Sequence, residues 1–139
     1  MAGLQTGVPA HDLGYRGMVH VVTKRITFAQ GAVETTVCRL PANASILPGS
    51  GVHVITAFND SGTDLLDVGL KSGSSTDDPN AYATLLVVSA IGFIALDELA
   101  AATNIKQTVE SLVTCTYTGE NTNATAGVAD VVIVYATKP

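Results

Sequence analysis

Apolar and polar residues alternate along most of this chain with a period of two. The segments GMVHVVTKRITF (17–28), AVETTVCRL (32–40) and QTVESLVTCTYT (107–118) show this alternation, and VADVVIVYA (128–136) is rich in β-branched residues. A period of two sends successive side chains to opposite faces of an extended strand, and valine, isoleucine and threonine favour strands. The pattern therefore predicts a β-strand in each of the four segments.

The stretch from Leu40 to Gly69, here called the cassette, reads LPANASILPGSGVHVITAFNDSGTDLLDVG. Val52 and Val54 flank His53, and this alternation predicts a half-buried strand. The polar residues at Asn59–Thr63 indicate a turn before a second short strand. We therefore expect a hairpin region whose exposed loops contact other proteins.

Three further segments complete the pattern. LKSGSSTDDPNA (70–81) is predicted to be a polar loop, because Pro79 is incompatible with a central strand. YATLLVVSAIGFIAL (82–96) is apolar on both faces and predicts one or two buried strands with a bend at Gly92. LDELAAATN (96–104) is compatible with a short helix and equally with a strand that continues into a loop.

About eight short strands at regular spacing, with no helical heptads and no βαβ rhythm, predict an all-β fold. The fold class that fits best is an antiparallel β-sandwich of the jelly-roll-like type. A length of 139 residues suits a single domain, which we place at residues 17–139.

Residues 1–16 are predicted to form an extended N-terminal arm, because glycines and a proline interrupt any period. At about 3.3 Å per residue such an arm could reach about 50 Å. A frayed terminus is the alternative. The isolated apolar residues of the arm favour contact with a neighbouring molecule, and the expected partner-binding residues are Leu4, Val8, Pro9, Leu13 and Tyr15.

Hydrophobic residues make up 47% of the chain and charged residues only 14%, against roughly 25% charged in typical soluble domains. The mean hydropathy is +0.35. So little charge would limit the solubility of an isolated monomer. We therefore expect part of the apolar surface to be covered by partner subunits.

The charge and the lengths of the apolar runs argue against nucleic acid and membranes as partners. With a net charge of −5 and no basic stripe, the chain is not expected to bind nucleic acid. The longest apolar run, Leu85 to Leu96, is shorter than the roughly 20 residues that span a bilayer. The first residues do not resemble a secretory signal, so we expect synthesis and assembly in a cytoplasm.

Cys38 and Cys115 both lie in segments that are predicted to be strands. In a cytoplasm the expected state is two reduced, buried thiols that act as small apolar residues. A disulfide would need their Cα atoms within about 7 Å of each other, which the sequence cannot establish.

No group of residues has the spacing of a metal centre or a catalytic site. His20 and His53 each lie between two valines, and are expected on the polar face of a strand. Asp97 and Glu98 are adjacent and would point to opposite faces of a strand, unlike the paired carboxylates of glycosidases. The sequence also lacks a GxSxG motif and a glycine-rich phosphate loop. We expect neither an enzyme nor a cofactor.

The polar residues of the turns have simple interpretations. The ligand order of an EF-hand is missing around the acidic residues of the cassette, so we interpret Asp60, Asp64 and Asp67 as part of a surface turn. The NxS/T triplets at 43–45, 59–61 and 123–125 are interpreted as asparagine-rich turns.

The order of short motifs in the chain resembles a group of small structural proteins of tailed-bacteriophage virions. In that group an LPA turn is followed by a valine-alternating strand, AFN and a short strand ending in VG, as in the cassette. The resemblance continues through STDDPNAYA and CTYTGENTNATAGVADVVIVYA, and covers roughly residues 26–136. Within this group the chain is most similar to head decoration, or cement, proteins.

The resemblance implies a non-enzymatic protein that decorates the capsid surface of a virion. It would bind as a homotrimer, bridge neighbouring major capsid protein subunits and stabilise the shell against the pressure of the DNA. Two alternatives stay open: a carbohydrate-binding β-sandwich module, although the chain has no tryptophan, and a tail-associated structural protein. A small hydrolase would require an unrecognised site that includes His20, His53 or Asp97.

Overall fold

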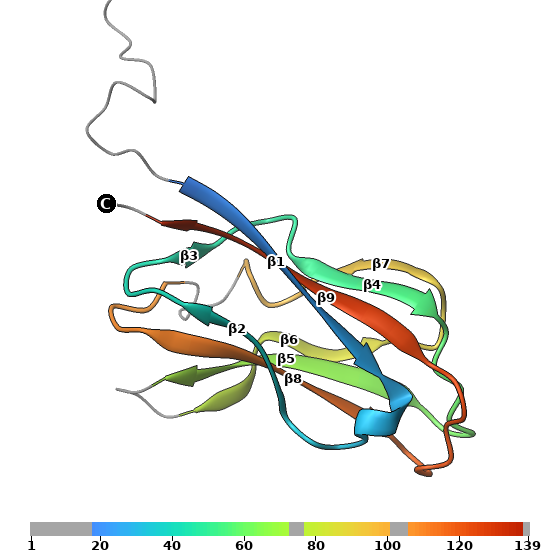
Figure 1. The fold of residues 1–139 in the computed structure, drawn as a ribbon. Helices are drawn as coiled ribbons and strands as arrows, with labels where there is room; N and C mark the ends of the chain where they lie inside the picture. The colour runs from blue at the N-terminus through green and yellow to red at the C-terminus, as the bar shows by residue number, and fades with distance from the viewer. Residues whose placement is uncertain (1–17, 73–76, 101–105, 138–139) are drawn as a thin grey trace, which may run out of the picture.

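The computed structural model describes residues 18–72, 77–100 and 106–137, and these residues form two antiparallel β-sheets. Figure 1 shows the sheets as two layers. The strands are β1 (Met18–Thr27), β2 (Thr35–Leu40), β3 (Ser45–Ile46), β4 (Gly51–Thr56), β5 (Asp64–Ser72), β6 (Asp78–Val87), β7 (Gly92–Ala95), β8 (Ser111–Gly119) and β9 (Val128–Thr137). A short 3₁₀ turn, Phe28–Gln30, follows β1.

Sheet A has the strand order β1-β9-β4-β7, with the two-residue β3 paired to β9, and sheet B has the order β2-β8-β5-β6. The chain passes from one sheet to the other after β1, β2, β4, β6, β7 and β8. The two sheets together form an all-β antiparallel sandwich. The predicted fold class is therefore confirmed, and the strand beyond the expected eight is the short β3.

Apolar side chains from the facing sides of both sheets form the core. The largest fully buried side chains come from five of the strands and the adjoining loops: Tyr82, Phe58, Leu66, Leu70, Ile133, Val52, Val54, Val68, Val88, Val113 and Val131. In the cassette strand Val52 and Val54 are buried while His53 is exposed, as the period of two predicted. Burial of such residues is the main contribution to the stability of a sandwich.

The interpretation of the cassette as a hairpin region was wrong. β4 lies in sheet A between β9 and β7, whereas β5 lies in sheet B between β8 and β6. The segment between them crosses from one layer to the other, and the two strands face each other across the core. The alternation identified both strands correctly, but it contains no information about which strands pair.

The predicted loop at residues 70–81 is shorter than expected, because β5 continues to Ser72 and β6 begins at Asp78. Pro79 lies in β6, which is an edge strand, where proline is tolerated. The backbone of Pro79 covers Gly69 and leaves no room for a Cβ atom there.

The segment after β7 is a loop as far as the structure describes it. Residues 96–100 form turns and bends rather than a helix or a strand, and residues 101–104 lie outside the described residues. The predicted arm, residues 1–16, also lies outside them. Within the described ranges no helix has the length and apolar character needed to cross a membrane.

Candidate functional site: interaction surfaces

One end of the sandwich is held together by a buried carboxylate. Oδ1 of Asp60 accepts hydrogen bonds from the backbone N–H groups of Gly62 and Asn121, both at 2.9 Å, and Oδ2 accepts one from Asn123 at 2.9 Å. Burial alone would raise the pKa of Asp60, but the backbone donors outweigh it and hold the pKa below its ordinary value. Asp60 thus joins the loop at residues 57–63 to the loop at residues 120–127.

A second buried carboxylate extends this connection. Oδ1 of Asp64 accepts the hydroxyl of Tyr117 at 2.6 Å and the backbone N–H of Asp60 at 3.1 Å. Burial, and then the bond to Asp64, raise the pKa of Tyr117. The Tyr117 ring packs on Phe58 with 4.6 Å between centroids. Asp60 and Asp64 are therefore buried, and their interpretation as part of a surface turn was wrong.

Asparagine side chains join the same two loops at the surface. Oδ1 of Asn59 accepts the backbone N–H groups of Thr125 and Ala126, both at 2.8 Å. The amide of Asn123 accepts the N–H of Ser61 and donates to its hydroxyl, both at 2.8 Å. Two of the NxS/T triplets thus contact each other. We call the joined residues 59–64 and 119–126 the loop clasp.

The loop clasp is a fixed surface with exposed polar groups. Ser61, Thr63, Glu120 and Asn121 are all exposed, and the carboxylate of Glu120 accepts the N–H of Thr63 at 3.0 Å. Side chains held in one arrangement lose little entropy on binding. That the loops of the cassette contact another protein stays a prediction, and the loop clasp is the surface on which it can be tested.

Asp67 and Asp97 bind the backbone of β6 where the pairing of this strand is irregular. Oδ1 of Asp67 accepts the N–H of Leu85 at 2.6 Å, and Oδ1 of Asp97 accepts the N–H of Thr84 at 3.1 Å. Leu85 has a φ of 53°, a left-handed conformation that is unfavourable for leucine. Asp67 and Asp97 thus stabilise backbone geometry here.

The two histidines of the described strands, His20 and His53, have different surroundings. The half-buried ring of His20 stacks on Tyr135 with 5.0 Å between centroids, and the exposed His53 is paired in register with Phe93 and Asp130. In the three ranges that the structure describes, no three histidine, cysteine or acidic side chains are grouped in a way that could hold a metal ion.

Both cysteines are free thiols, Cys38 half-buried and Cys115 buried. Burial raises the pKa of Cys38 to about 11 and that of Cys115 to about 12. Because the thiolate is the reactive form of cysteine, both side chains are unreactive at neutral pH. This agrees with the expected role of small apolar residues.

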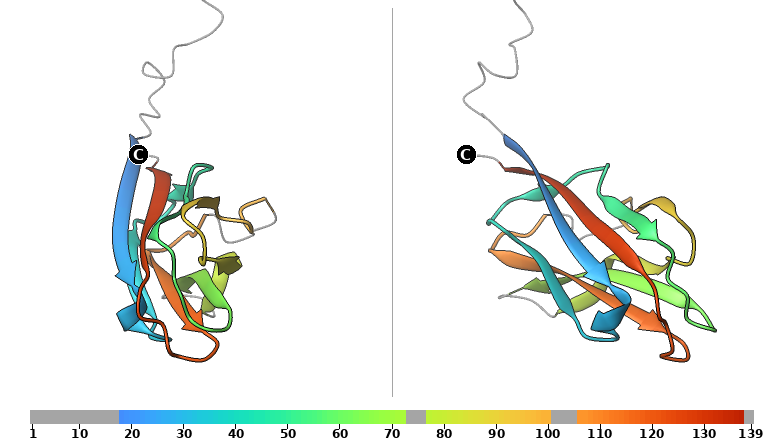
Figure 2. Two further views of the ribbon diagram at one scale, coloured as in Figure 1. Left: turned by 90° about the vertical axis from the view of Figure 1, so that its right-hand side faces the viewer. Right: turned by 45° about the vertical axis from the view of Figure 1, so that its right-hand side comes forward.

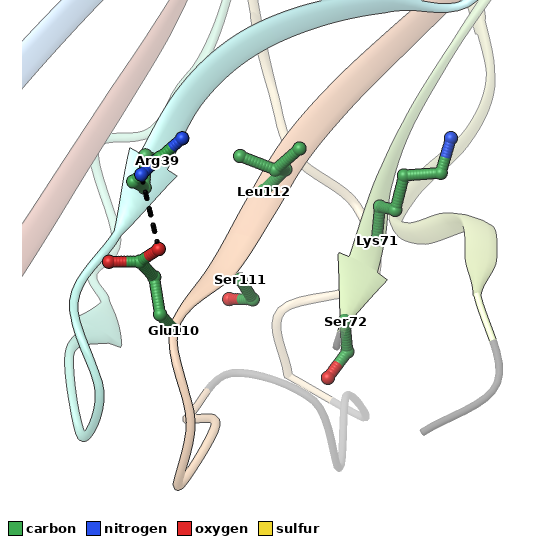
Figure 3. Close-up of a pocket in the computed structure, with 6 residues that line it drawn as sticks. All are labelled: Arg39, Lys71, Ser72, Glu110, Ser111 and Leu112. Carbon is green, nitrogen blue, oxygen red and sulfur yellow. Dashed lines mark ion pairs between the residues drawn. The ribbon is translucent and has the colours of Figure 1, made fainter. Parts of the chain in front are cut away.

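A groove of about 280 Å³ lies between the ends of β2, β5 and β8. Figure 3 shows its six lining residues, with Arg39 paired to Glu110 at 3.2 Å on one side. On the β5 side, Lys71 pairs with Glu34 at 2.9 Å. Each cation already has a carboxylate partner, so the groove offers no unpaired positive charge to an anionic ligand.

The five residues that we predicted to bind a partner, Leu4, Val8, Pro9, Leu13 and Tyr15, lie outside the described residues and stay predictions. The pattern analysis missed the loop clasp, and it also missed large exposed apolar residues within the sandwich. The latter are Met18, Val19, Val21, Val33, Ile55, Leu85, Val87, Ile91 and Phe93. The sequence did indicate some of these exposed apolar residues, because the predicted strands at residues 17–28 and 128–136 have valines on both faces.

The sequence matches no family model and no curated protein. Its fold is similar to that of two solved chains from bacteriophage capsids. A chain in the capsid asymmetric unit of cyanophage Pam1 is 20% identical, with a TM-score of 0.58 over 98% of this chain and 95% of that one. A chain in the acidic stable capsid structure of Helicobacter pylori bacteriophage KHP30 is 15% identical, with a TM-score of 0.56 over 88% of this chain and 92% of that one.

At these identities the likeness shows a shared fold. It extends over nearly the whole length of each chain, so the sandwich is not a fragment of a larger fold in either neighbour. Both neighbours are chains of phage capsid structures, which agrees with the resemblance seen in the order of sequence motifs.

Proposed function

We propose that this chain is a non-enzymatic structural protein of a bacteriophage virion, which decorates the capsid and stabilises it by bridging major capsid protein subunits. The observation that carries the proposal is the nearly full-length likeness of its fold to chains from two phage capsid structures. The independent resemblance of its motif order to phage decoration proteins supports the same role. On this proposal the protein is assembled in the host cytoplasm and resides on the capsid surface.

The proposed mechanism uses several weak contacts at once. A homotrimer would present three equivalent surfaces to the shell, and once one surface binds, the other two bind at a high effective concentration. Individually weak contacts then give stable attachment. The loop clasp supports this mechanism, because its hydrogen bonds between distant loops keep each contact surface in one geometry.

The N-terminal arm is proposed to provide a further contact with a neighbouring capsid subunit. Its apolar residues would bind in a groove on that subunit, and burial of each aliphatic side chain contributes about 1.5–3 kcal/mol before the cost of ordering the arm. The five arm residues named above are the proposed contacts. The first described strand, β1, is an edge strand of sheet A.

A capsid-binding experiment tests the proposal. Capsids purified from phage particles that lack this protein are mixed with the purified chain, and binding is measured by co-sedimentation. We expect saturable binding to expanded capsids and a higher temperature of DNA release, followed with a DNA-binding dye. Absence of binding to any capsid form would contradict the proposal. Specific binding to glycans instead would favour the carbohydrate-binding alternative, and labelling of tails rather than heads would favour the tail-associated one.

The role of the arm is tested in the full-length chain. The variant carries Leu4→Ser, Val8→Ser, Leu13→Ser and Tyr15→Ser, and we expect weaker capsid binding with unchanged thermal unfolding. The control carries Val33→Ser and Val87→Ser, which replace exposed apolar residues outside the arm. Equal loss of binding in variant and control would contradict a specific role for the arm.

A further inference from the structure

The outer side of sheet A is unusually apolar for a surface that faces water. In β9 the inward side chains, Ala129, Val131, Ile133 and Tyr135, are buried, as expected. The outward side chains between them include Val132, Val134 and Ala136, which are half-buried. An antiparallel sheet with one face in water normally alternates apolar with polar residues. β9 is instead apolar on both sides over this part of its length.

The neighbouring strands continue this character on the same side. Val21 is paired with Val134, and Val19 with Ala136, so both β1 valines point outward, and each is 63% exposed. At the opposite edge of the sheet Phe93 is 55% exposed, and its ring occupies the space over Gly51 that a Cβ would fill. Figure 2 shows β1 and β9 side by side.

We call this surface the apolar face. It consists of the outward side chains of Val19, Val21, Phe93, Ala95, Val132, Val134 and Ala136. The exposed area of this face comes mainly from Val19, Val21 and Phe93, each of which is more than half exposed, and exposed apolar surface of this kind marks interaction sites. The remaining residues of the face add to this area.

Arg25 and Asp130 lie on this side of the sheet and neutralise each other, and the exposed His53 lies beside Asp130 on the same side. Nε of Arg25 donates to Oδ1 of Asp130 at 2.9 Å, and Nη2 donates to Oδ2 at 3.0 Å. This bidentate pair links β1 to β9 and leaves no net charge from the two groups. Sheet B differs, because Lys71 of β5 pairs there with Glu34, and Arg39 of β2 pairs with Glu110, which directly precedes β8.

We propose that the apolar face is the surface through which copies of this chain associate. The face is neutral and apolar, and its complement is another neutral and apolar surface.

A second copy of the chain can keep the apolar face permanently buried. A partner without steering charges gains little from long-range attraction, and an apolar face left open promotes aggregation. Another copy of the chain is present from synthesis onward. This inference rests on the self-association in the proposed function and names its surface. In a homotrimer the contact would be heterologous, with one part of the face meeting a different part of the neighbour's face.

Sedimentation velocity of full-length variants tests the interface. Val21→Glu and Phe93→Glu place a charge at opposite edges of the apolar face, and Val87→Glu is the matched control, because Val87 is 58% exposed on sheet B. We expect the wild type and the control to form an oligomer of the 14.2 kDa chain. Each test variant should associate at least roughly a hundredfold more weakly, because the contact then buries an unpaired carboxylate against apolar side chains.

Circular dichroism establishes that each variant is folded, and the two separate test positions guard against a single misfolded variant. A monomeric wild type would overturn the inference, as would folded test variants with the wild-type mass or a control that dissociates equally.

The four-serine arm variant separates this interface from the arm. It should keep the wild-type oligomeric mass, and a monomeric arm variant would assign the cover of the apolar face to the arm and overturn the inference. A protein that forms the oligomer through this face and fails to bind capsids would contradict the proposed function and leave the interface in place.

Discussion

The hydroxyl of Tyr117 donates a 2.6 Å hydrogen bond to Oδ1 of Asp64. This bond joins β8 to the start of β5 inside the buried end of sheet B, where both side chains are almost completely covered. A buried carboxylate depends on such donors, because it has lost its hydration. The loop clasp is built around this bond and the bonds to Asp60.

Replacement of Tyr117 by phenylalanine should therefore destabilise the protein. The ring keeps its contact with Phe58, but Asp64 loses a donor while it stays buried, which costs about 1–3 kcal/mol. Urea unfolding followed by circular dichroism measures the change. Tyr135→Phe is the control, because the Tyr135 hydroxyl makes no hydrogen bond to another of the described residues. A loss no larger than that of the control would contradict this role of Tyr117.

The lowered pKa of Asp60 predicts acid sensitivity. Its carboxylate is favoured in the folded state, so it contributes stability above the unfolded-state pKa of about 3.9, and this contribution is lost as the pH falls through the lower folded-state value. Asp130, whose pKa is lowered mainly by its hydrogen bond to Arg25, acts in the same direction. Melting temperatures should be nearly constant from neutral pH to about pH 5 and fall below about pH 4.

Asp60→Asn isolates the contribution of this residue. The amide keeps one acceptor oxygen and replaces the other by an NH₂ group that faces a backbone donor, so the melting temperature at neutral pH should fall. The decrease below about pH 4 should also become shallower, because one coupled protonation is removed. Asp77→Asn, at an exposed carboxylate, is the control. An unchanged acid profile in Asp60→Asn would show that other groups cause the acid sensitivity.

The strands could be predicted from the sequence, because the burial of one side of a strand leaves a period of two in the residues themselves. Val52 and Val54 illustrate this, since their inward positions follow directly from the alternation with His53. The pairing of β4 with β9 could not be predicted in this way. It depends on contacts between residues more than 70 positions apart, to which the local pattern is insensitive.

The loop clasp could not be predicted for a related reason. The partners of Asp60 are backbone N–H groups at residues 121 and 123, and every residue except proline has such a group. The sequence therefore shows only two polar turns, and the aspartate looks like an ordinary turn residue. The apolar face did leave a signal, because valines occupy both sides of β1 and β9.

Gly127 should be less tolerant of alanine than Gly31. Gly127 has a φ of 150°, and a Cβ there would overlap the buried ring of Phe58, so both the backbone and the core would have to move. We expect Gly127→Ala to cost about 2–4 kcal/mol. Gly31 has a φ of 56° and a ψ of −151°, which favour glycine, but open space around it, so Gly31→Ala should cost only the backbone strain, about 1–3 kcal/mol. Equal losses in urea unfolding would contradict this packing role of Gly127.

The raised pKa values of the cysteines predict that native thiols resist alkylation. At neutral pH neither Cys38 nor Cys115 should react with iodoacetamide on the time scale on which a model thiol is consumed, because burial keeps both protonated. Both should react quickly in denaturant. As the pH rises toward 11, the half-buried Cys38 should react before Cys115, whose pKa is about 12. Mass spectrometry of tryptic peptides identifies the labelled site, and the variant Cys38→Ser provides the control. Rapid labelling of Cys115 in the folded protein at neutral pH would show that the core between β2 and β8 opens readily.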